Sequence, residues 1–222
     1  YPVHSPGFAR RPNTPSAPEL NADTALLNDL QRQMTALREG AGDSVDILLD
    51  MNFNFKTEGY LRVIRALKQF NLLWFELDLF NPEALAYIRQ QGNETIASCE
   101  SLYGHREFRR YFEAQSMDVA IVDIPWNGAW QSYKIAVIAD AYETNVAPHN
   151  FYGHLCTMMS AHLCAAIPNF RIMEIDVDDV PWRDDLVTDV PLIENGMLTI
   201  PDRPGWGTDI NEDAIAAHPV VR

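Results

Sequence analysis

Val119-Ala120-Ile121-Val122-Asp123 is a run of four apolar residues that ends on an aspartate. An apolar run without alternation is typical of a β-strand covered on both faces, as the strands of parallel sheets are. Such a strand delivers its last side chain to the carboxyl edge of the sheet, where parallel α/β barrels carry their functional groups. The run therefore predicts both a buried strand and a candidate site residue, Asp123.

The same pattern recurs along the chain at a nearly constant interval. The side chains that end these runs are Asp50, Glu76, Glu100, Asp123, His149 and Glu174. Successive members of this set are separated by 26, 24, 23, 26 and 25 residues. One short strand, one crossover helix and two loops need about that much chain, so each interval has the length of a βα unit.

Amphipathic stretches fill the intervals, and the apolar residues of the first, such as Leu61, Ile64 and Leu67, recur at helical spacing. We predict helices over 57–70, 82–91, 105–114, 130–141 and 153–166. The alternation of strand and helix predicts an α/β fold with a parallel sheet. Right-handed crossovers then place the ends of all the strands on one face.

The organisation of the chain is predicted as one barrel domain over residues 1–222, a length that such barrels commonly have. Residues 1–21 are interpreted as a strand end and a loop, 22–175 as βα units, and 176–222 as a C-terminal extension. A helix is expected over 22–39, with Asp23 as its N-cap and Gly40 as its stop signal. The extension is expected to hold a short strand over 196–201 and a helix over 211–218.

Composition narrows the classes of partner. The formal net charge of −14 disfavours nucleic acid and anionic membranes, but permits a small anionic substrate if a divalent cation reverses the local charge. No apolar run approaches the roughly 18 residues of a membrane span. The three cysteines have no metal-ligand spacing and are interpreted as reduced structural residues of a cytoplasmic protein.

Three of the end residues, Asp50, Glu76 and Glu100, are carboxylates on consecutive predicted strands. Brought together they would repel one another, and a divalent cation removes that repulsion. Mg²⁺ prefers oxygen ligands and keeps positions open for water or substrate, so these three are candidate Mg²⁺ ligands. Asn52, two residues beyond Asp50 on an extended chain, is expected to add a hydrogen bond or a ligand and is the candidate substrate-binding residue. The alternative is that the carboxylates are ordinary polar strand ends, caps or ion-pair partners.

Asp123 and His149 end the next two predicted strands, within plausible hydrogen-bonding reach of each other. A carboxylate beside an imidazole fixes its tautomer and raises its basicity, which makes His149 a candidate general base or acid. The alternative is a loop histidine that happens to lie beside a carboxylate. Glu174 is expected either to contact the substrate or to complete the outer shell of the metal. We expect His105 and His218 at the surface and His154 at a helix start.

Taken together, these motifs resemble the barrel domain of the enolase superfamily, in the mandelate racemase/muconate lactonizing enzyme group. The motifs are Asp50-Met51-Asn52, Trp74-Phe75-Glu76, Ser98-Cys99-Glu100, Val122-Asp123, Ala147-Pro148-His149, Ile172-Met173-Glu174 and the tail Ile200–Gly207. The resemblance implies a TIM-type (β/α) barrel and Mg²⁺ held by Asp50, Glu76 and Glu100. It also implies removal of the proton α to a carboxylate, through an enediolate. An Asp–His pair is typical of members that resemble mandelate racemase and the acid-sugar dehydratases.

The resemblance favours dehydration of an acid sugar to a 2-keto-3-deoxy product, with a small carboxylate substrate and a homo-oligomeric enzyme. The alternatives are a racemase or epimerase of a 2-hydroxy acid, and a barrel that binds metal or ligand without turnover. The family's first strand or strands and its N-terminal capping domain are expected to be absent from this chain. If Tyr1–His4 is the tail of a strand, Pro2 replaces a family lysine and His4 is a candidate second base. The chain also departs from the family after Glu76, where Leu77-Asp78 replaces the usual Glu-Pro.

Overall fold

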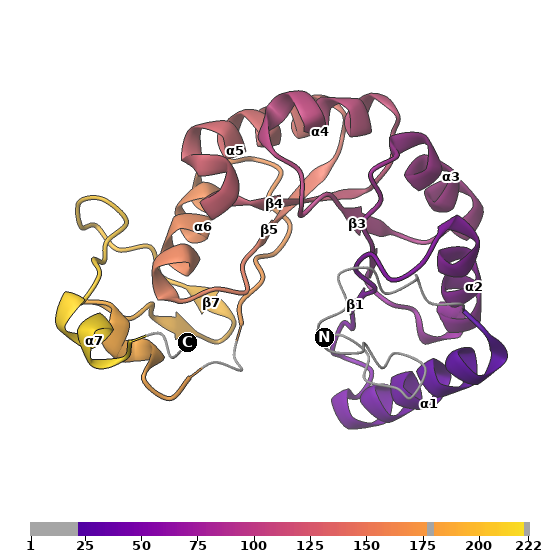
Figure 1. Ribbon diagram of the computed structural model, residues 1–222, viewed down its shortest axis with the longest axis horizontal. Coiled ribbons are helices and arrows are strands. Elements are labelled where there is room, and N and C mark those ends of the chain that lie inside the picture. The colour runs from indigo at the N-terminus through magenta and orange to yellow at the C-terminus, as the bar shows by residue number, and fades with distance from the viewer. Residues whose placement is uncertain (1–21, 177–179, 220–222) are drawn as a thin grey trace. The chain divides into compact units, whose positions relative to one another are not determined.

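The computed structural model describes residues 22–176 and 180–219 (Figure 1). They divide into two compact units, with boundaries after Ser101, Phe108 and Val119. Unit 1 holds the described residues up to Ser101 together with Arg109–Val119, and unit 2 holds Leu102–Phe108 and the described residues from Ala120 onward. Tyr1–His4 and the loop predicted after it lie outside the described residues. That residues 1–222 form a single domain stays a prediction.

Unit 1 is built from βα repeats. Its elements are α1 (Thr24–Ala41), β1 (Leu49–Asp50), α2 (Thr57–Leu67), the short helix η1 (Lys68–Phe70), β2 (Phe75–Glu76), α3 (Pro82–Gly92), β3 (Ile96–Ser98) and the second half of α4 (Gly104–Glu113). β1 pairs with β2 in parallel and β2 pairs with β3 in parallel. Asp50 lies opposite Glu76 in the register of the first pair, so two of the predicted end residues share one edge of the sheet.

Helices α1, α2 and α3 lie side by side along the strands of unit 1 (Figure 1). The predicted apolar face of α2 is confirmed for Leu61, Ile64 and Leu67, which are all buried, as are Tyr60 and Val63 beside them. Phe70, which the same spacing includes, lies in η1 and is half-buried. The apolar residues of α2 lie on one side of the helix, and burial of that side stabilises the helix.

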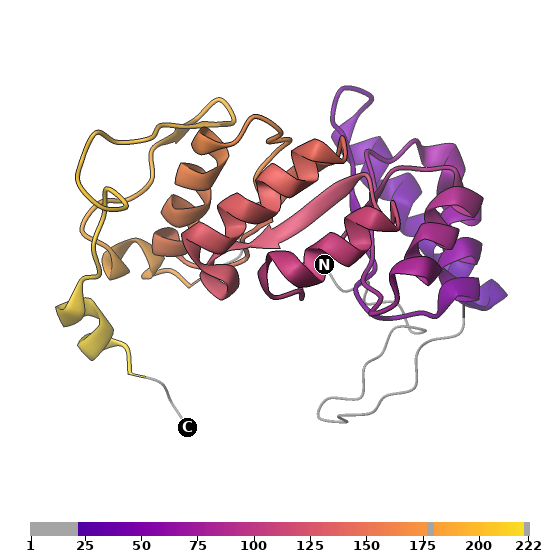
Figure 2. The ribbon, with the colours of Figure 1, turned by 90° about the horizontal axis from the view of Figure 1, so that it is seen from above.

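Unit 2 continues the alternation of strand and helix. Its elements are β4 (Val119–Asp123), α5 (Ile124–Ala141), β5 (Asn145–His149), α6 (His154–Ala166), η2 (Arg183–Leu186), β6 (Ile193–Glu194), β7 (Met197–Leu198) and α7 (Glu212–Ala217). All five residues of β4 are buried, as its unbroken apolar run predicts. α5 and α6 pack side by side (Figure 2). β4 and β5 are neighbouring strands, and β6 and β7 form a separate antiparallel hairpin.

The sixth predicted strand, Phe170–Met173, is only partly present. A single parallel bridge joins Phe170 to Val146, with hydrogen bonds from Val146 N–H to the Asn169 carbonyl (2.8 Å) and from Arg171 N–H to the Val146 carbonyl (2.9 Å). Two residues further along β5 stands Pro148, which has no N–H to donate, so the ladder cannot continue in full. The strand prediction is wrong to that extent, although the segment does run beside β5.

The limits of α1 confirm one predicted signal and correct another. Asp23 is its N-cap, and the Asp23 carboxylate accepts the Leu26 N–H at 2.9 Å. Gly40 is not the stop, because the helix continues to Ala41. The chain leaves the helix at Gly42, whose φ of 75° lies in the region open to glycine, and whose N–H donates to the Arg38 carbonyl at 2.9 Å.

None of the helices in the described part of the chain combines the length and the apolarity needed to cross a membrane.

Replacing each of these two glycines by alanine should change stability in opposite directions. Gly42→Ala places a β-carbon on a residue with φ of 75° and should lower the free energy of unfolding by about 1 kcal/mol. Gly40→Ala lies inside α1 with no atom within 4 Å of the added carbon, and should raise the free energy of unfolding by about 0.5–1 kcal/mol. Urea unfolding measures both. Equal effects of the two substitutions would contradict the helix end assigned to Gly42.

Candidate active site

The carboxylate of Asp123 is fully buried at the end of β4 and starts the helix that follows. Asp123 Oδ1 accepts the Trp126 N–H at 2.7 Å, which makes Asp123 the N-cap of α5. The helix therefore begins earlier than the predicted 130–141, and a break at Gly128 (φ 72°, ψ 153°) separates its first turn from the rest. Gly128 can adopt this conformation because it has no β-carbon.

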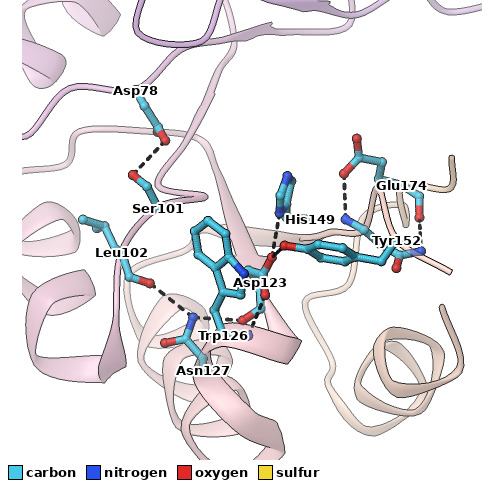
Figure 3. A network of polar contacts seen from close by, with 10 residues as sticks. Asp78, Ser101, Leu102, Asp123, Trp126, Asn127, His149, Tyr152 and Glu174 are labelled. Atoms are coloured by element: carbon cyan, nitrogen blue, oxygen red, sulfur yellow. Dashed lines mark hydrogen bonds and ion pairs between the residues drawn. The ribbon is translucent and has the colours of Figure 1, made fainter. Parts of the chain in front are cut away.

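The other oxygen of the same carboxylate holds His149 at the end of β5. His149 Nδ1 lies 2.7 Å from Asp123 Oδ2, which confirms the predicted hydrogen-bonding reach of the two side chains. Tyr152 donates its hydroxyl to the same oxygen at 2.6 Å (Figure 3). With Nδ1 committed to Asp123, Nε2 is the ring nitrogen that can exchange a proton with a bound molecule. His149 is 8% exposed, so a small part of its surface remains open to solvent.

Aromatic rings surround the imidazole of His149. The ring centroids of Phe151, Tyr152 and Trp126 lie 5.1, 5.7 and 6.1 Å from its own. Trp126 in turn stacks on Tyr103 at 5.6 Å between centroids. These ring contacts restrict the plane of the imidazole, although Phe151 and Trp126 are themselves exposed to solvent.

Glu174 is held by Asn150, the residue that follows His149. The Asn150 N–H donates to Glu174 Oε2 at 2.7 Å, and Asn150 Nδ2 donates to the Glu174 main-chain carbonyl at 3.0 Å. Asn150 is fully buried whereas Glu174 is exposed. The structure thus places Glu174 next to the end of β5, in the same unit as His149.

In unit 1, both carboxylate oxygens of the candidate metal ligand Asp50 accept hydrogen bonds from Asn52. The main-chain N–H of Asn52 donates to Asp50 Oδ1 at 2.7 Å, and its side-chain amide donates to Oδ2. Asn52 has a φ of 46° and lies in a turn, so the extended chain predicted for this pair is wrong. Asparagine tolerates this left-handed conformation better than most residues, which explains how the side chain folds back onto Asp50.

Glu76 and Glu100 are half-buried, like Asp50. Trp74 Nε1 lies 3.3 Å from Glu76 Oε2, and Glu100 follows directly on Cys99, whose φ is 90°. The three carboxylates suit Mg²⁺ in ligand type, because all offer oxygen, and they lie at or just beyond the ends of three consecutive paired strands. Across the described ranges, however, no three His, Cys, Asp or Glu side chains gather closely enough to hold a metal ion.

Three other histidines make contacts away from the Asp123–His149 pair. His154 begins α6 as predicted and lies 2.6 Å from Asp184, and His218 stacks on Trp182. His105 is half-buried and contacts Gln131 at 2.7 Å. His4 lies outside the described residues.

The cysteines are free thiols, as predicted. Burial, reinforced by the charge of Asp78, raises the pKa of Cys99, and burial raises the pKa of Cys164 to about 12. Both therefore stay protonated and unreactive at neutral pH.

Sequence reasoning missed Tyr152 and Asn150, which hold Asp123 and Glu174. Each lies within three residues of His149, so their place in the sequence is a signal that could have found them. Their hydrogen bonds, however, reach residues 29 and 24 positions away in the chain, which no local pattern reveals.

A family model described as "Enolase C-terminal domain-like" matches residues 20–214. A D-xylonate dehydratase of Haloferax volcanii is 33% identical over 188 residues, which cover 83% of this chain and 46% of the relative. A D-gluconate dehydratase of Thermoproteus tenax is 27% identical over 209 residues, which cover 92% of this chain and 42% of the relative. The chain thus spans about half the length of the curated relatives it matches.

Solved structures give the same fold. A protein of Burkholderia xenovorans strain LB400, named as a candidate L-alanine-DL-glutamate epimerase and crystallised with magnesium and fumarate, is 56% identical. It superposes with a TM-score of 0.90 over 92% of this chain and 51% of its own. A mandelate racemase/muconate lactonizing enzyme-like protein of Rubrobacter xylanophilus is 29% identical, with a TM-score of 0.83 over 89% of this chain and 52% of its own.

The α/β fold with its parallel sheet, the match over residues 20–214 and these likenesses together show that the chain belongs to the enolase superfamily, in the family of enolase C-terminal domain-like proteins.

Proposed function

We propose that this chain belongs to a Mg²⁺-dependent enzyme that dehydrates an acid sugar to a 2-keto-3-deoxy acid. The observation that carries the proposal is the buried pair of His149 and Asp123, 2.7 Å apart, at the ends of two neighbouring strands. The family resemblance associates such a pair with the acid-sugar dehydratases and with relatives of mandelate racemase. Curated relatives of the chain are named as dehydratases of xylonate and gluconate, which supports the same reading.

His149 has the properties that proton transfer in a dehydration requires. Asp123 accepts a hydrogen bond from Nδ1 and thereby favours a form of the ring whose Nε2 can take a proton from carbon. The proton that His149 gains can then be returned to the departing hydroxyl group, which leaves as water. One correctly placed histidine can therefore serve both halves of an elimination in turn.

Asp50, Glu76 and Glu100 would hold the Mg²⁺ ion. When bound, the ion supplies positive charge that stabilises the negative charge developing on the substrate carboxylate. Asn52 donates to both oxygens of Asp50 and so fixes the direction from which that carboxylate can bind a ligand. Glu174 and Asn150 lie beside His149 and are positioned to contact the remainder of the substrate.

An epimerase is the second candidate, favoured by the 56% identity to the Burkholderia protein with that candidate name. Inversion at one carbon needs a proton donor on the face opposite the base, whereas elimination does not. Of the predicted pair of bases, only His149 lies in the described part of the chain, because His4 falls outside it. We place dehydration first because curated relatives of the chain are named as dehydratases of acid sugars.

Incubation of the intact protein with Mg²⁺ and a panel of hexonate and pentonate acids tests the proposal. We expect loss of water and a 2-keto-3-deoxy product from at least one acid. Incorporation of deuterium from D₂O without loss of water would support the epimerase instead. Neither product nor exchange with any acid of the panel would favour a barrel that binds without turnover.

His149→Asn should lower kcat by about 10²–10⁴-fold, because that is the usual contribution of one general acid or base. Mg²⁺ affinity should stay at the wild-type value, since His149 is not among the proposed ligands. His105→Asn is the matched control: its ring also makes a 2.7 Å contact, but to the neutral Gln131, and its kcat should be unchanged. A His149→Asn variant with near wild-type turnover would exclude the role given to this histidine.

Tyr152→Phe should lower kcat by about tenfold, because a hydrogen bond to a charged group contributes about 1.5–3 kcal/mol and part of it will be replaced by water. Tyr133→Phe, at a 40% exposed site on α5, controls for the loss of a tyrosine hydroxyl. Steady-state kinetics of both variants provide the measurement. Equal rates for the two would show that Asp123 orients His149 without help from Tyr152.

Mg²⁺ at about 100 times its dissociation constant should stabilise the wild-type protein by about 2.7 kcal/mol, seen as a rise in melting temperature that a chelator reverses. Asp50→Asn and Glu76→Gln should reduce or abolish this rise. Asp46→Asn removes an exposed charge four residues before Asp50 and should keep the full effect. An undiminished rise in the first two variants would place the cation elsewhere.

A further inference from the structure

Asp78 is a buried carboxylate to which the proposed chemistry gives no role. It is 4% exposed and lies two residues beyond Glu76, at the end of β2. A carboxylate in such a place is costly unless hydrogen-bond donors surround it. Those donors come from one short segment of unit 1, the residues on either side of Glu100.

The side chain of Asp78 accepts three hydrogen bonds from that segment. Oδ1 accepts from the Ser98 hydroxyl at 2.8 Å and from the Cys99 N–H at 2.6 Å. Oδ2 accepts from the Ser101 hydroxyl at 3.2 Å (Figure 3). Because the three donors stand on both sides of Glu100, the carboxylate fixes the chain before and after that residue.

The backbone at Cys99 adds a reason for this grip. Its φ of 90° is one that residues with a β-carbon rarely adopt, and such conformations persist only where the surroundings hold them in place. The bond from the Cys99 N–H to Asp78 is one such restraint, and the burial of the Cys99 side chain is another. The turn made at Cys99 sets the direction in which Glu100, the next residue, leaves the strand.

The main chain of Asp78 also contacts the segment that follows β1. Its N–H donates to the Asn52 carbonyl at 3.3 Å. Asn52 in turn donates to both oxygens of Asp50. One residue, itself attached to the end of β2, is therefore bonded to the segment that follows β1 and to the segment that follows β3.

We propose that Asp78 is a positioning residue that sets the arrangement of Asp50, Glu76 and Glu100 for binding a divalent cation. The inference rests on the proposed function, because it assigns these three carboxylates to Mg²⁺. Groups that hydrogen-bond around metal ligands orient them, and their loss weakens metal binding even though they never touch the ion.

A residue that merely stabilises β3 would behave differently, and the chain contains one for comparison. Asp118 accepts the Ile96 N–H at 2.9 Å, at the first residue of β3, and also binds Arg89. Asp78 and Asp118 thus each accept a main-chain N–H at one end of the same strand. Asp118 lies at the end away from Glu100, so it shares the structural role without the positioning role.

The test is calorimetric titration of the intact protein with MgCl₂, with urea unfolding of each variant in parallel. Asp78→Asn should weaken Mg²⁺ binding by about ten- to a hundredfold, the usual effect of losing such a partner of a metal ligand. Asp118→Asn should lower the free energy of unfolding and leave Mg²⁺ affinity at the wild-type value. Glu100→Gln, which alters a proposed ligand itself, reports whether the cation binds where we expect.

A second variant keeps the test informative if Asp78→Asn does not fold. Ser98→Ala combined with Ser101→Ala removes two of the three donors to Asp78 and leaves every charge in place. It should weaken Mg²⁺ binding several-fold, and that loss could not come from a change in net charge near the cation.

The outcomes separate the inference from the function on which it rests. Wild-type Mg²⁺ affinity in Asp78→Asn and in the double serine variant, together with loss of binding in Glu100→Gln, would overturn the role of Asp78 alone. Equal weakening by Asp78→Asn and Asp118→Asn would also overturn it. A wild-type protein without Mg²⁺ binding, or Glu100→Gln with undiminished binding, would overturn both proposals.

Discussion

The hydrogen bonds accepted by the Asp123 carboxylate are the interactions on which the rest of unit 2 depends. One oxygen caps α5, and the other accepts hydrogen bonds from His149 and Tyr152. All three bonds converge on a side chain with no solvent exposure, where each is stronger than it would be in water and its loss more costly. The start of a helix and the orientation of an imidazole are therefore fixed by the same group, and neither can shift without the other.

In unit 1 a single buried carboxylate, that of Asp78, likewise accepts several hydrogen bonds. Asp78 joins the segments that follow three strands, and one of those segments carries the unusual backbone of Cys99. In both units a buried carboxylate holds the chain just beyond the strands, where an α/β fold of this kind carries its chemistry. The strands set the spacing of the residues at their ends, and the buried carboxylates set the directions in which the neighbouring segments and side chains point.

The sequence predicts the positions of the strand ends well, but it predicts the directions of the side chains at those ends poorly. Apolar runs such as Val119–Val122 and the constant interval between their ends are local signals, so the strands, the helices between them and the pairing of His149 with Asp123 could be read from them. Asp78 binds the Cys99 N–H across 21 positions of sequence, a contact that depends on the packing of two strands and leaves no local pattern.

The predictions that the structure contradicts are those in which a single atom, or its absence, determines the local backbone. The missing N–H of Pro148 interrupts the last strand, and a left-handed backbone at Gly42 rather than Gly40 ends α1. For Asp50, Glu76 and Glu100, spacing predicts the strand ends they occupy but not the directions of their side chains. Those directions depend on contacts that a local pattern does not reveal, such as the hydrogen bonds from Asn52 to Asp50 across a left-handed turn.

A crystal structure of the intact protein with Mg²⁺ and a slowly reacting acid sugar tests the central claim most directly. We expect the ion on Asp50, Glu76 and Glu100, and His149 Nε2 within about 3.5 Å of the carbon that loses its proton, the separation needed for reaction. An ion bound to other residues, or a substrate whose α-carbon lies away from His149, would contradict the proposed function.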